Sequence, residues 1–319
     1  MDVPWDVLAG HGGSRLLWTE VPASVRARTE AFLGRPISRV ESRPGGFSPG
    51  VAGIAIADDG RRVFLKAAGP LPNPDAAGIH RREILITQRL PARAPVPRLL
   101  WSLDDAQTGW VVLMFGELTG APPQLPWRRA ELERVLHGLA ELGEYLTPTP
   151  VPLEYAGDVT SSGLLGNYWT RLAAEQSTSL DDWCRENLEQ LMSLENQAPA
   201  ALAGDALVHL DIRADNVLLA PDSVAFVDWP HARQGAAWLD VLFFAPSVAM
   251  QGGPTPDDVL ALYPGELPER RQLLPAVAAI AGFFTWGALQ PPPPGLPFLR
   301  QFQAAQGDVA RRWLAHLLA

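Results

Sequence analysis

The periodicity of the apolar residues changes near residue 120, and this change limits the folds open to the chain. Before it, short runs rich in β-branched residues are separated by Gly- and Pro-containing turns, a pattern typical of a small antiparallel sheet. One segment, residues 76–90, has helical spacing instead and is ended by Pro91. The predicted strands are residues 37–43, 51–57, 61–67, 96–103 and 109–115.

Long amphipathic stretches follow, so the rest of the chain is predicted to be mainly helical. These stretches are residues 127–146, 164–174, 180–194 and 270–289. We therefore expect an α+β, bilobal fold. The first part is a helical N-terminal extension over 1–35, whose helix is ended by Gly34. A five-stranded antiparallel N-terminal lobe with one main helix follows over 36–116, and a larger, mainly helical C-terminal lobe spans 117–319.

Composition excludes several classes of protein. The chain has 319 residues, 47% of them hydrophobic, which is enough for a large core. Its net charge of -9 does not favour nucleic acid as a partner. The single cysteine, Cys184, excludes an internal disulfide. The chain shows neither a membrane-spanning apolar run nor the basic-then-apolar order of a secretory signal, so we expect no membrane association and a cytoplasmic location.

The charge is uneven along the chain. Residues 1–120 hold 14 Lys and Arg against 12 Asp and Glu, whereas residues 121–319 hold 12 against 23. The acidic second part either attracts cations, such as a metal ion or a polyamine-like substrate, or is ordinary solubilising charge. Lys66 is the only lysine among 26 basic residues. A compact ammonium suits a tight phosphate pocket better than a planar guanidinium does, although a single surviving lysine can also be chance.

The pattern His209-x-Asp211-x-x-x-x-Asn216, with Asp228 one hairpin later, suggests phosphoryl transfer. Transfer to an alcohol needs an acceptor for the hydroxyl proton, a role that fits Asp211, and oxygen ligands for magnesium, which Asn216 and Asp228 offer. The alternative is a surface loop with scattered carboxylates. Apolar residues close to both ends of the pattern favour the catalytic interpretation, because a carboxylate is costly to bury without a function.

The first lobe contains a candidate nucleotide site. Gly45, Gly46 and Ser48 lie in a turn between two predicted strands, where glycine lets the backbone approach phosphate oxygens. Lys66 ends the third strand, and Glu83 lies on the helix that follows. A lysine held by a helix glutamate is the arrangement that kinases use. An ordinary turn and a solvated glutamate are the simpler alternatives.

In this order the elements resemble the aminoglycoside phosphotransferase family, small-molecule kinases with a protein-kinase-like fold, over residues 40–244. The resemblance implies that Asp211 is the catalytic base, that Asn216 and Asp228 bind Mg²⁺, and that Lys66, oriented by Glu83, binds the nucleotide phosphates. It also implies a hinge over 113–118 that faces the purine ring. The remaining roles that it implies are nucleotide binding by Met114, Phe115 and Gly116, and structural support by His209 and Asp240.

Three departures from the family pattern are visible. Leu210 stands where many members have glycine, which restricts the backbone there. Pro49 removes a donor from the phosphate loop. Asp228 is followed by Trp229 and Pro230 without the glycine of protein kinases or a long activation segment, which argues for a small-molecule enzyme.

The leading hypothesis is therefore an ATP- or GTP-dependent O-phosphotransferase, monomeric or homodimeric, that acts on a hydroxyl of a small molecule such as an antibiotic. Alternatives are a kinase of a metabolite such as choline, homoserine or a sugar, and a non-catalytic pseudokinase-like protein. The acidic residues of the helical lobe are candidate substrate ligands, although helix-start charges account for several of them equally well. The substrate candidates are Asp181, Asp182, Trp183 and Asp257.

Overall fold

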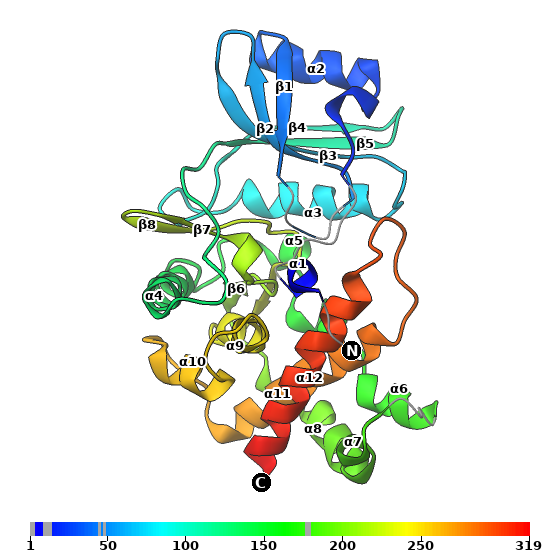
Figure 1. The fold of residues 1–319 in the computed structure, drawn as a ribbon, viewed down its shortest axis with the longest axis vertical. Coiled ribbons are helices and arrows are strands. Elements are labelled where there is room, and N and C mark those ends of the chain that lie inside the picture. The colour runs from blue at the N-terminus through cyan, green and yellow to red at the C-terminus, as the bar shows by residue number, and fades with distance from the viewer. Residues whose placement is uncertain (1–3, 9–14, 44–45, 47–48, 176–179) are drawn as a thin grey trace.

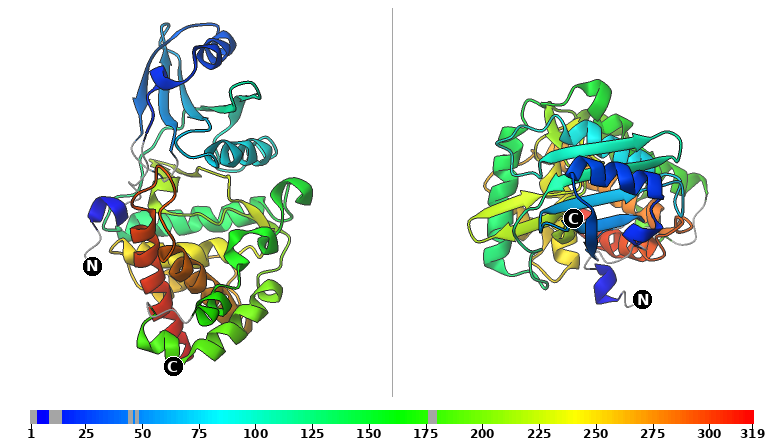
Figure 2. Two further views of the ribbon diagram at one scale, coloured as in Figure 1. Left: turned by 90° about the vertical axis from the view of Figure 1, so that its right-hand side faces the viewer. Right: turned by 90° about the horizontal axis from the view of Figure 1, so that it is seen from above.

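The computed structural model describes residues 4–8, 15–43, 46, 49–175 and 180–319. The chain forms two lobes stacked along the long axis of the molecule, with the sheet in the upper lobe and most helices in the lower one (Figure 1). A view from the side shows the same division, with helix α3 lying at the junction (Figure 2). The structure thus confirms the expected bilobal α+β architecture.

The upper lobe is built on a five-stranded antiparallel sheet in the order β1-β2-β3-β5-β4. All five predicted strands are present, with small shifts at their ends. The fourth begins later than expected, at Leu99, since Pro97 cannot donate to a ladder. The strands are β1 (Ile37–Ser42), β2 (Val51–Ala57), β3 (Arg62–Ala68), β4 (Leu99–Asp105) and β5 (Trp110–Gly116).

One helix covers each face of this sheet. Helix α2 (Ala23–Leu33) packs on one face, where Leu65 and Met114 lie in the same apolar cluster as Val25. Helix α3 (Ala76–Thr87) packs on the other, where Phe115 lies in a cluster with Ala77. The predicted helix end at Gly34 is confirmed, because this residue has φ 69° and donates back to the last turn of α2. Both faces of the sheet are therefore covered by a helix, and this packing holds the sheet rigid.

The lower lobe is mainly helical, and its two longest helices, α11 and α12, pack together; α11 also lies along α8. The segment expected as one helix over 180–194 is divided at Asn187, whose side-chain Nδ2 donates to the Trp183 carbonyl and ends α7. The helix α10 is not among the predicted amphipathic stretches, since seven residues are too few to show a clear period, but a helix start was one of the two explanations for the charge of Asp257. The helices are α4 (Arg129–Tyr145), α5 (Leu153–Ala156), α6 (Tyr168–Ala174), α7 (Asp182–Glu186), α8 (Leu188–Ala201), α9 (Leu239–Met250), α10 (Pro256–Leu262), α11 (Arg270–Ala288) and α12 (Leu299–Leu318).

Short elements complete the described structure. A helix α1 (Trp5–Leu8) and a 3-10 turn η1 (Trp18–Glu20) precede α2. In the lower lobe the 3-10 turns are η2 (Val159–Ser161), η3 (Gly163–Leu165) and η4 (Ala214–Asn216). Two small two-stranded antiparallel sheets are also present: β6 (Ala206–Val208) pairs with β9 (Arg233–Gly235), and β7 (Val217–Ala220) pairs with β8 (Ser223–Phe226). The β7–β8 pair is the hairpin predicted between Asn216 and Asp228.

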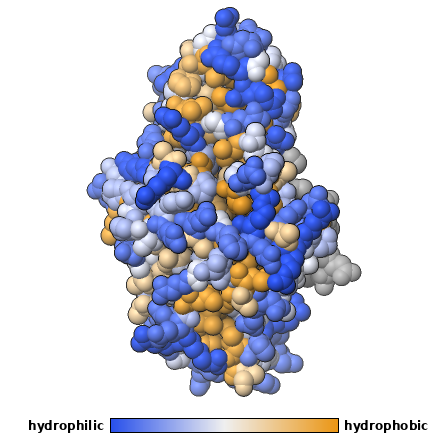
Figure 3. All heavy atoms as spheres, turned by 90° about the vertical axis from the view of Figure 1, so that its left-hand side faces the viewer, coloured by the Kyte–Doolittle hydropathy of each residue, from blue (hydrophilic) through white to orange (hydrophobic). Residues whose placement is uncertain are grey.

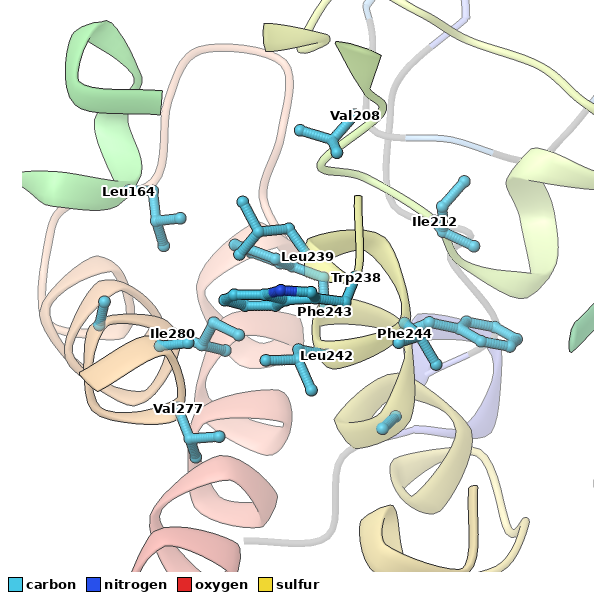
Figure 4. Close-up of a cluster of buried hydrophobic side chains, with 14 of the residues drawn as sticks. Leu164, Val208, Ile212, Trp238, Leu239, Leu242, Phe243, Phe244, Val277 and Ile280 are labelled. Atoms are coloured by element: carbon cyan, nitrogen blue, oxygen red, sulfur yellow. The ribbon is translucent and has the colours of Figure 1, made fainter. Parts of the chain in front are cut away.

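An apolar core supports the loop between β6 and β7. Figure 4 shows Leu239 and Leu242 of α9 at its centre, with Val208 and Ile212 from the two sides of the loop and Ile280 of α11 around them. All five side chains are buried. Because interiors are close-packed, the loop cannot shift without displacing this core.

The chain between the lobes is also fixed. Ala121 and Leu219 exchange two backbone hydrogen bonds of 3.0 and 2.8 Å, which pair the connecting segment with β7. The connection that was expected to act as a hinge is thus attached to the hairpin that follows the catalytic pattern.

The surface is mixed in character. On the face shown in Figure 3 most side chains are hydrophilic, and apolar ones gather in a strip over the lower lobe. Within the described ranges, none of the helices has the length and apolar character that crossing a bilayer requires.

A buried glutamate joins α8 to the start of α6. The Glu195 carboxylate, 4% exposed, accepts hydrogen bonds from the backbone N–H groups of Trp169 and Thr170 at 2.9 and 3.1 Å, and from the Thr170 hydroxyl. These N–H groups belong to the first turn of α6, which has no partner for them within the helix.

We predict that Glu195→Ala lowers the free energy of unfolding by about 2 kcal/mol or more, because buried donors are left unsatisfied. Urea denaturation measures the loss. Glu189→Ala, at an exposed position of the same helix, is the control and is expected to change the value by less than ~0.5 kcal/mol. Equal losses in the two variants would contradict the role given to Glu195.

Candidate active site

An ion triad joins the two lobes at the cleft. Lys66 of β3 lies with its Nζ 2.7 and 2.8 Å from the two Glu83 oxygens of α3 and 2.7 Å from Asp228 Oδ1 of the lower lobe. Burial alone lowers the pKa of Lys66, but the two carboxylates outweigh it and raise the pKa above its ordinary value. Burial likewise favours a protonated Asp228, yet Lys66 holds the Asp228 pKa well below its usual range. The lysine is therefore charged and faces an ionised Asp228.

Two residues of helix α3, Arg82 and Glu83, hold this helix against the segment after Asp228 and against α5. Arg82 donates to the backbone carbonyl of Pro230 at 3.0 Å and to that of Ala156 at 3.3 Å. Glu83 accepts from the Trp229 N–H at 3.4 Å. Because α3 also packs on the sheet, these contacts fix the position of Lys66 relative to the lower lobe.

The loop after β6 holds a strained backbone. Leu210 has φ 62°, in the left-handed region that costs a residue with a Cβ atom about 1–2 kcal/mol. The buried Asp240 of α9 accepts the N–H groups of His209 and Leu210 at 2.8 and 2.7 Å, and this pair of bonds stabilises the turn. Burial raises the Asp240 pKa to about 6. Leucine is thus accommodated where glycine was expected because Asp240 holds the backbone.

His209 supports the same loop as a neutral ring. Its Nε2 lies 2.9 Å from the Val227 carbonyl and its Nδ1 accepts the Asp211 N–H at 3.2 Å, which assigns the proton to Nε2. The ring packs edge-on against Trp229 with centroids 4.6 Å apart. Burial lowers the His209 pKa to about 4, so the ring carries no charge near neutral pH. These contacts agree with a supporting role for both His209 and Asp240.

Asp211 and Asn216 lie side by side at the end of this loop. The Asn216 Nδ2 donates to the Asp211 carbonyl at 2.8 Å and to its Oδ2 at 3.1 Å, which directs the Asn216 Oδ1 away from Asp211. Arg213 lies 3.2 Å from Asp211 Oδ1 and pairs with Asp215 at 3.0 Å. Burial raises the Asp211 pKa, and Arg213 opposes that effect. A carboxylate with a raised pKa is a better proton acceptor for a hydroxyl.

Oxygen donors for a divalent cation lie in the same place. Among the described residues, no three His, Cys, Asp or Glu side chains gather as a metal cage. Magnesium bound with phosphates needs only one or two protein oxygens, since water and phosphate fill the other positions. Asn216 and Asp228 both line one cavity, and their side chains offer an amide oxygen and a carboxylate, so this pair of residues fits Mg²⁺.

Two cavities meet at Asp228. The first, of about 560 Å³, lies between the lobes and holds Lys66 and Asn216 as well as Asp228. The second, of about 420 Å³, lies mostly in the lower lobe, with Ile79 of α3 also in its wall, and holds Asp211 and Asp228. The apolar side chains of the first cavity form a slot suited to a flat ring. They include Val51, Ile54, Phe64, Phe115, Leu118, Leu218 and Val227.

The structure brings most of the predicted nucleotide residues to the first cavity. Gly46, Phe115 and Gly116 line it together with Lys66 and Glu83. Met114 does not, because strand alternation turns its side chain into the core under α2, where it is fully buried. Two residues predicted in the phosphate loop, Gly45 and Ser48, lie outside the described residues.

The residues suggested for the substrate lie elsewhere. Asp181 accepts the Cys184 N–H at the start of α7 and pairs with Arg311 at 3.1 Å. Asp257 accepts the Trp313 indole N–H at 2.9 Å. Neither these two nor Asp182 and Trp183 line the cavity that holds Asp211. The helix-start explanation accounts for Asp181, and the cavity lining does not support an acidic wall.

Arg15 is a further residue of the first cavity, and sequence reasoning did not find it. Leu16 donates to the Gly50 carbonyl at 3.0 Å, which places the chain before α2 beside the start of β2. The Arg15 Nε donates to the Arg43 carbonyl at 3.3 Å, and its side chain lines the cavity near Gly46. Burial lowers the Arg15 pKa, but Asp228 and Asp215 oppose this. Nearly every basic residue of the chain is arginine, so the residue type of Arg15 did not indicate a site residue.

Comparison with known proteins identifies the family. Residues 44–275 match the family model described as the phosphotransferase enzyme family. The chain belongs to this family. The match confirms the resemblance on which the sequence analysis relied and the expectation of an enzyme. A search of the curated proteins found no match.

Solved structures confirm the fold of this phosphotransferase. It resembles a choline/ethanolamine kinase family protein from Mesorhizobium loti, with 15% identity, coverage of 92% of this chain and 94% of that chain, and a TM-score of 0.61. It resembles the GDP and kanamycin complex of APH(2")-IIia, with 15% identity, 92% and 97% coverage and a TM-score of 0.59. A spectinomycin phosphotransferase in complex with ADP and spectinomycin has 13% identity, 91% and 93% coverage and a TM-score of 0.55.

We predict that removing the Arg213 charge moves the acid limb of the phosphotransferase pH profile to higher pH. We expect Asp211, the candidate base, to accept a proton only when it is ionised, so that activity is lost as the pH falls through the Asp211 pKa, which Arg213 lowers. The measurement is kcat/KM against pH for Arg213→Met. Arg213→Lys keeps the charge and is expected to shift the limb less. An unmoved limb in a folded Arg213→Met variant would show that Arg213 does not tune the base.

We also predict that Arg15→Ala raises the KM for the nucleotide about tenfold, the equivalent of one charge-assisted hydrogen bond to phosphate. Steady-state kinetics with varied nucleotide concentration measure the change. Arg39→Ala, which removes an exposed arginine paired with Glu41 on β1, is the control. Unchanged nucleotide KM values in both variants would remove Arg15 from the nucleotide site.

Proposed function

We propose that this phosphotransferase moves the γ-phosphoryl group of ATP or GTP to a hydroxyl of a small molecule. The observation that carries the proposal is the meeting of the two cavities at Asp228, with Lys66 on one side and Asp211 on the other. The nucleotide occupies the first cavity, with its purine in the apolar slot near Phe115, and the acceptor occupies the second.

In this proposal each residue has a separate task. Asp211 accepts the proton of the acceptor hydroxyl while the oxygen of that hydroxyl bonds to the γ-phosphorus. The bond from that phosphorus to the bridging oxygen breaks, and the electron pair leaves with the nucleoside diphosphate. Lys66 and Arg15 bind the negative phosphates, and Glu83 orients Lys66. Asn216 and Asp228 would hold Mg²⁺, which supplies charge neutralisation for the phosphates when bound.

Three observations favour catalysis over a pseudokinase-like role. The proposed base, the lysine and both magnesium-ligand candidates line two cavities that meet at Asp228. Asp211 is half-buried beside Asn216 and has a raised pKa, an environment that a binding protein does not require. Solved relatives by fold contain ADP and GDP, which supports a nucleotide in this cleft and leaves both purines as candidates.

We predict that Asp211→Asn lowers the phosphoryl-transfer rate by about 10²–10⁴-fold, the usual contribution of a positioned base. Its affinity for nucleotide is expected to stay unchanged, because Asp211 lines the acceptor cavity and not the nucleotide cavity. Release of ADP or GDP with Mg²⁺ present, together with calorimetric nucleotide binding, measures both properties. Asp222→Asn, at the exposed turn of the β7–β8 hairpin, is the matched control. Equal turnover in Asp211→Asn and the wild type would exclude Asp211 as the base.

A further inference from the structure

The second cavity is lined mainly by apolar and aromatic side chains. It lies between the catalytic loop, the 3-10 turn η3 and the helices α9, α11 and α12. Its volume of about 420 Å³ is that of a site for a single small molecule. The polar residues Ser162, Gln303 and Gln306 that also line it are uncharged. The apolar lining comprises Ile79, Leu164, Leu210, Ile212, Phe243, Phe283, Phe284, Leu296, Leu299 and Phe302.

The charges around this cavity do not suit a cationic ligand. Among the described residues, the carboxylates that line it are those of Asp211 and Asp228, and both are already paired with cations, Arg213 and Lys66. Arg233 and His231 add positive or ionisable groups to the lining. Within the described ranges no carboxylate lies in ion-pair distance of Arg233, which donates instead to the carbonyls of His231 and Ala232.

A polycation would therefore lose its hydration without gaining a counter-charge. Burying an unpaired ammonium is strongly unfavourable, and each further amine adds to the cost. The acidic surplus of the chain does not change this, because the acidic residues considered for the substrate do not line the cavity. The charge that attracts cations at long range is separate from the surface that contacts the acceptor.

An aromatic cage for a quaternary ammonium is the other possibility for a cation. Such cages rely on the open faces of Trp, Tyr or Phe rings, and Phe is a weaker partner than Trp. The Phe302 ring is already covered by the Arg213 guanidinium, whose Cζ lies 5.3 Å from the ring centroid. A second cation would face both that guanidinium and an incomplete cage.

We infer that the acceptor is an uncharged, largely apolar alcohol, bound with its carbon skeleton against the phenylalanines of α9, α11 and α12 and one hydroxyl at Asp211. This rests on the proposed function, since it assigns the second cavity to the acceptor. Ser162, Gln303 and Gln306 provide neutral hydrogen-bonding groups for the other oxygens of such a molecule. The enzyme then differs in substrate class from a kinase of polycationic amino sugars or of choline.

A three-part acceptor panel tests the inference with the full chain. The first part contains uncharged macrocyclic and polycyclic alcohols, the second contains polycationic amino sugars such as kanamycin, and the third contains choline and related ammonium alcohols. Phosphorylated products are detected by mass spectrometry, and binding to the ADP-loaded enzyme is measured by calorimetry. We expect products and binding in the first part only.

A charge placed in the cavity wall provides the matched variant. Leu299 is the first residue of α12 and lines the cavity, so Leu299→Asp adds a carboxylate where the helix dipole tolerates it. Phe298→Asp places the same charge one residue earlier, at an exposed position outside the lining. We expect Leu299→Asp to raise the KM for uncharged acceptors about tenfold or more, and Phe298→Asp to leave it unchanged.

The possible results separate the two proposals. Binding or phosphorylation of amino sugars or ammonium alcohols in preference to uncharged ones overturns the substrate class while leaving phosphoryl transfer intact. A panel in which no uncharged alcohol binds or is phosphorylated also overturns the substrate class. Equal KM changes in Leu299→Asp and Phe298→Asp have the same consequence. By contrast, the absence of Asp211-dependent nucleotide turnover with every acceptor and with water overturns the proposed function itself.

Discussion

The contact of Lys66 with two carboxylates from different parts of the chain is the constraint on which the site depends. Glu83 approaches the lysine from α3 and Asp228 approaches it from the lower lobe, each at 2.7 Å. Burying a lysine and a glutamate is favourable only when they are paired, and removing one partner from such a group typically costs about 3–5 kcal/mol. The sheet, α3 and the segment after β8 are thus held in one relative position. This position determines the geometry of the cleft between the lobes.

A second requirement is a rigid catalytic loop. Leu210 and Asp228 both have positive φ values, of 62° and 71°, and such strain persists only where the surroundings determine the backbone. Asp240 holds the first of these residues and the Lys66 ion pair holds the second. Asp240 belongs to α9, whose apolar side chains form the core in Figure 4, so the packing of α9 supports the turn that carries Asp211. The second cavity begins at this loop, so its apolar wall and Asp211, the proposed base, face the same space.

The sequence was sufficient to predict much of this arrangement, for physical reasons that also explain the failures. Strands such as Val51–Ala57 have a composition that is specific to a sheet, and the spacing of Asp211, Asn216 and Asp228 reflects the chemistry of phosphoryl transfer. The side chain of Met114 does not reach the cavity, because this residue and its strand neighbour Phe115 face opposite sides of the sheet, and only the fold shows which of the two faces the cavity. Sequence patterns did not indicate Arg15 or the phenylalanines of α9, α11 and α12 that line the second cavity. Each reaches its cavity through packing between segments that are distant in the chain. Asp257 was selected for its charge, whereas its partner is the Trp313 indole.

A crystal structure of the chain with Mg²⁺ and a non-hydrolysable ATP analogue tests the central claim most directly. The account predicts phosphate oxygens within hydrogen-bond distance of the Lys66 Nζ, with the metal ion bound by Asn216 and Asp228 and the terminal phosphate facing Asp211. A nucleotide bound outside the cleft, or phosphates that leave Lys66 in contact with its two carboxylates alone, would contradict it.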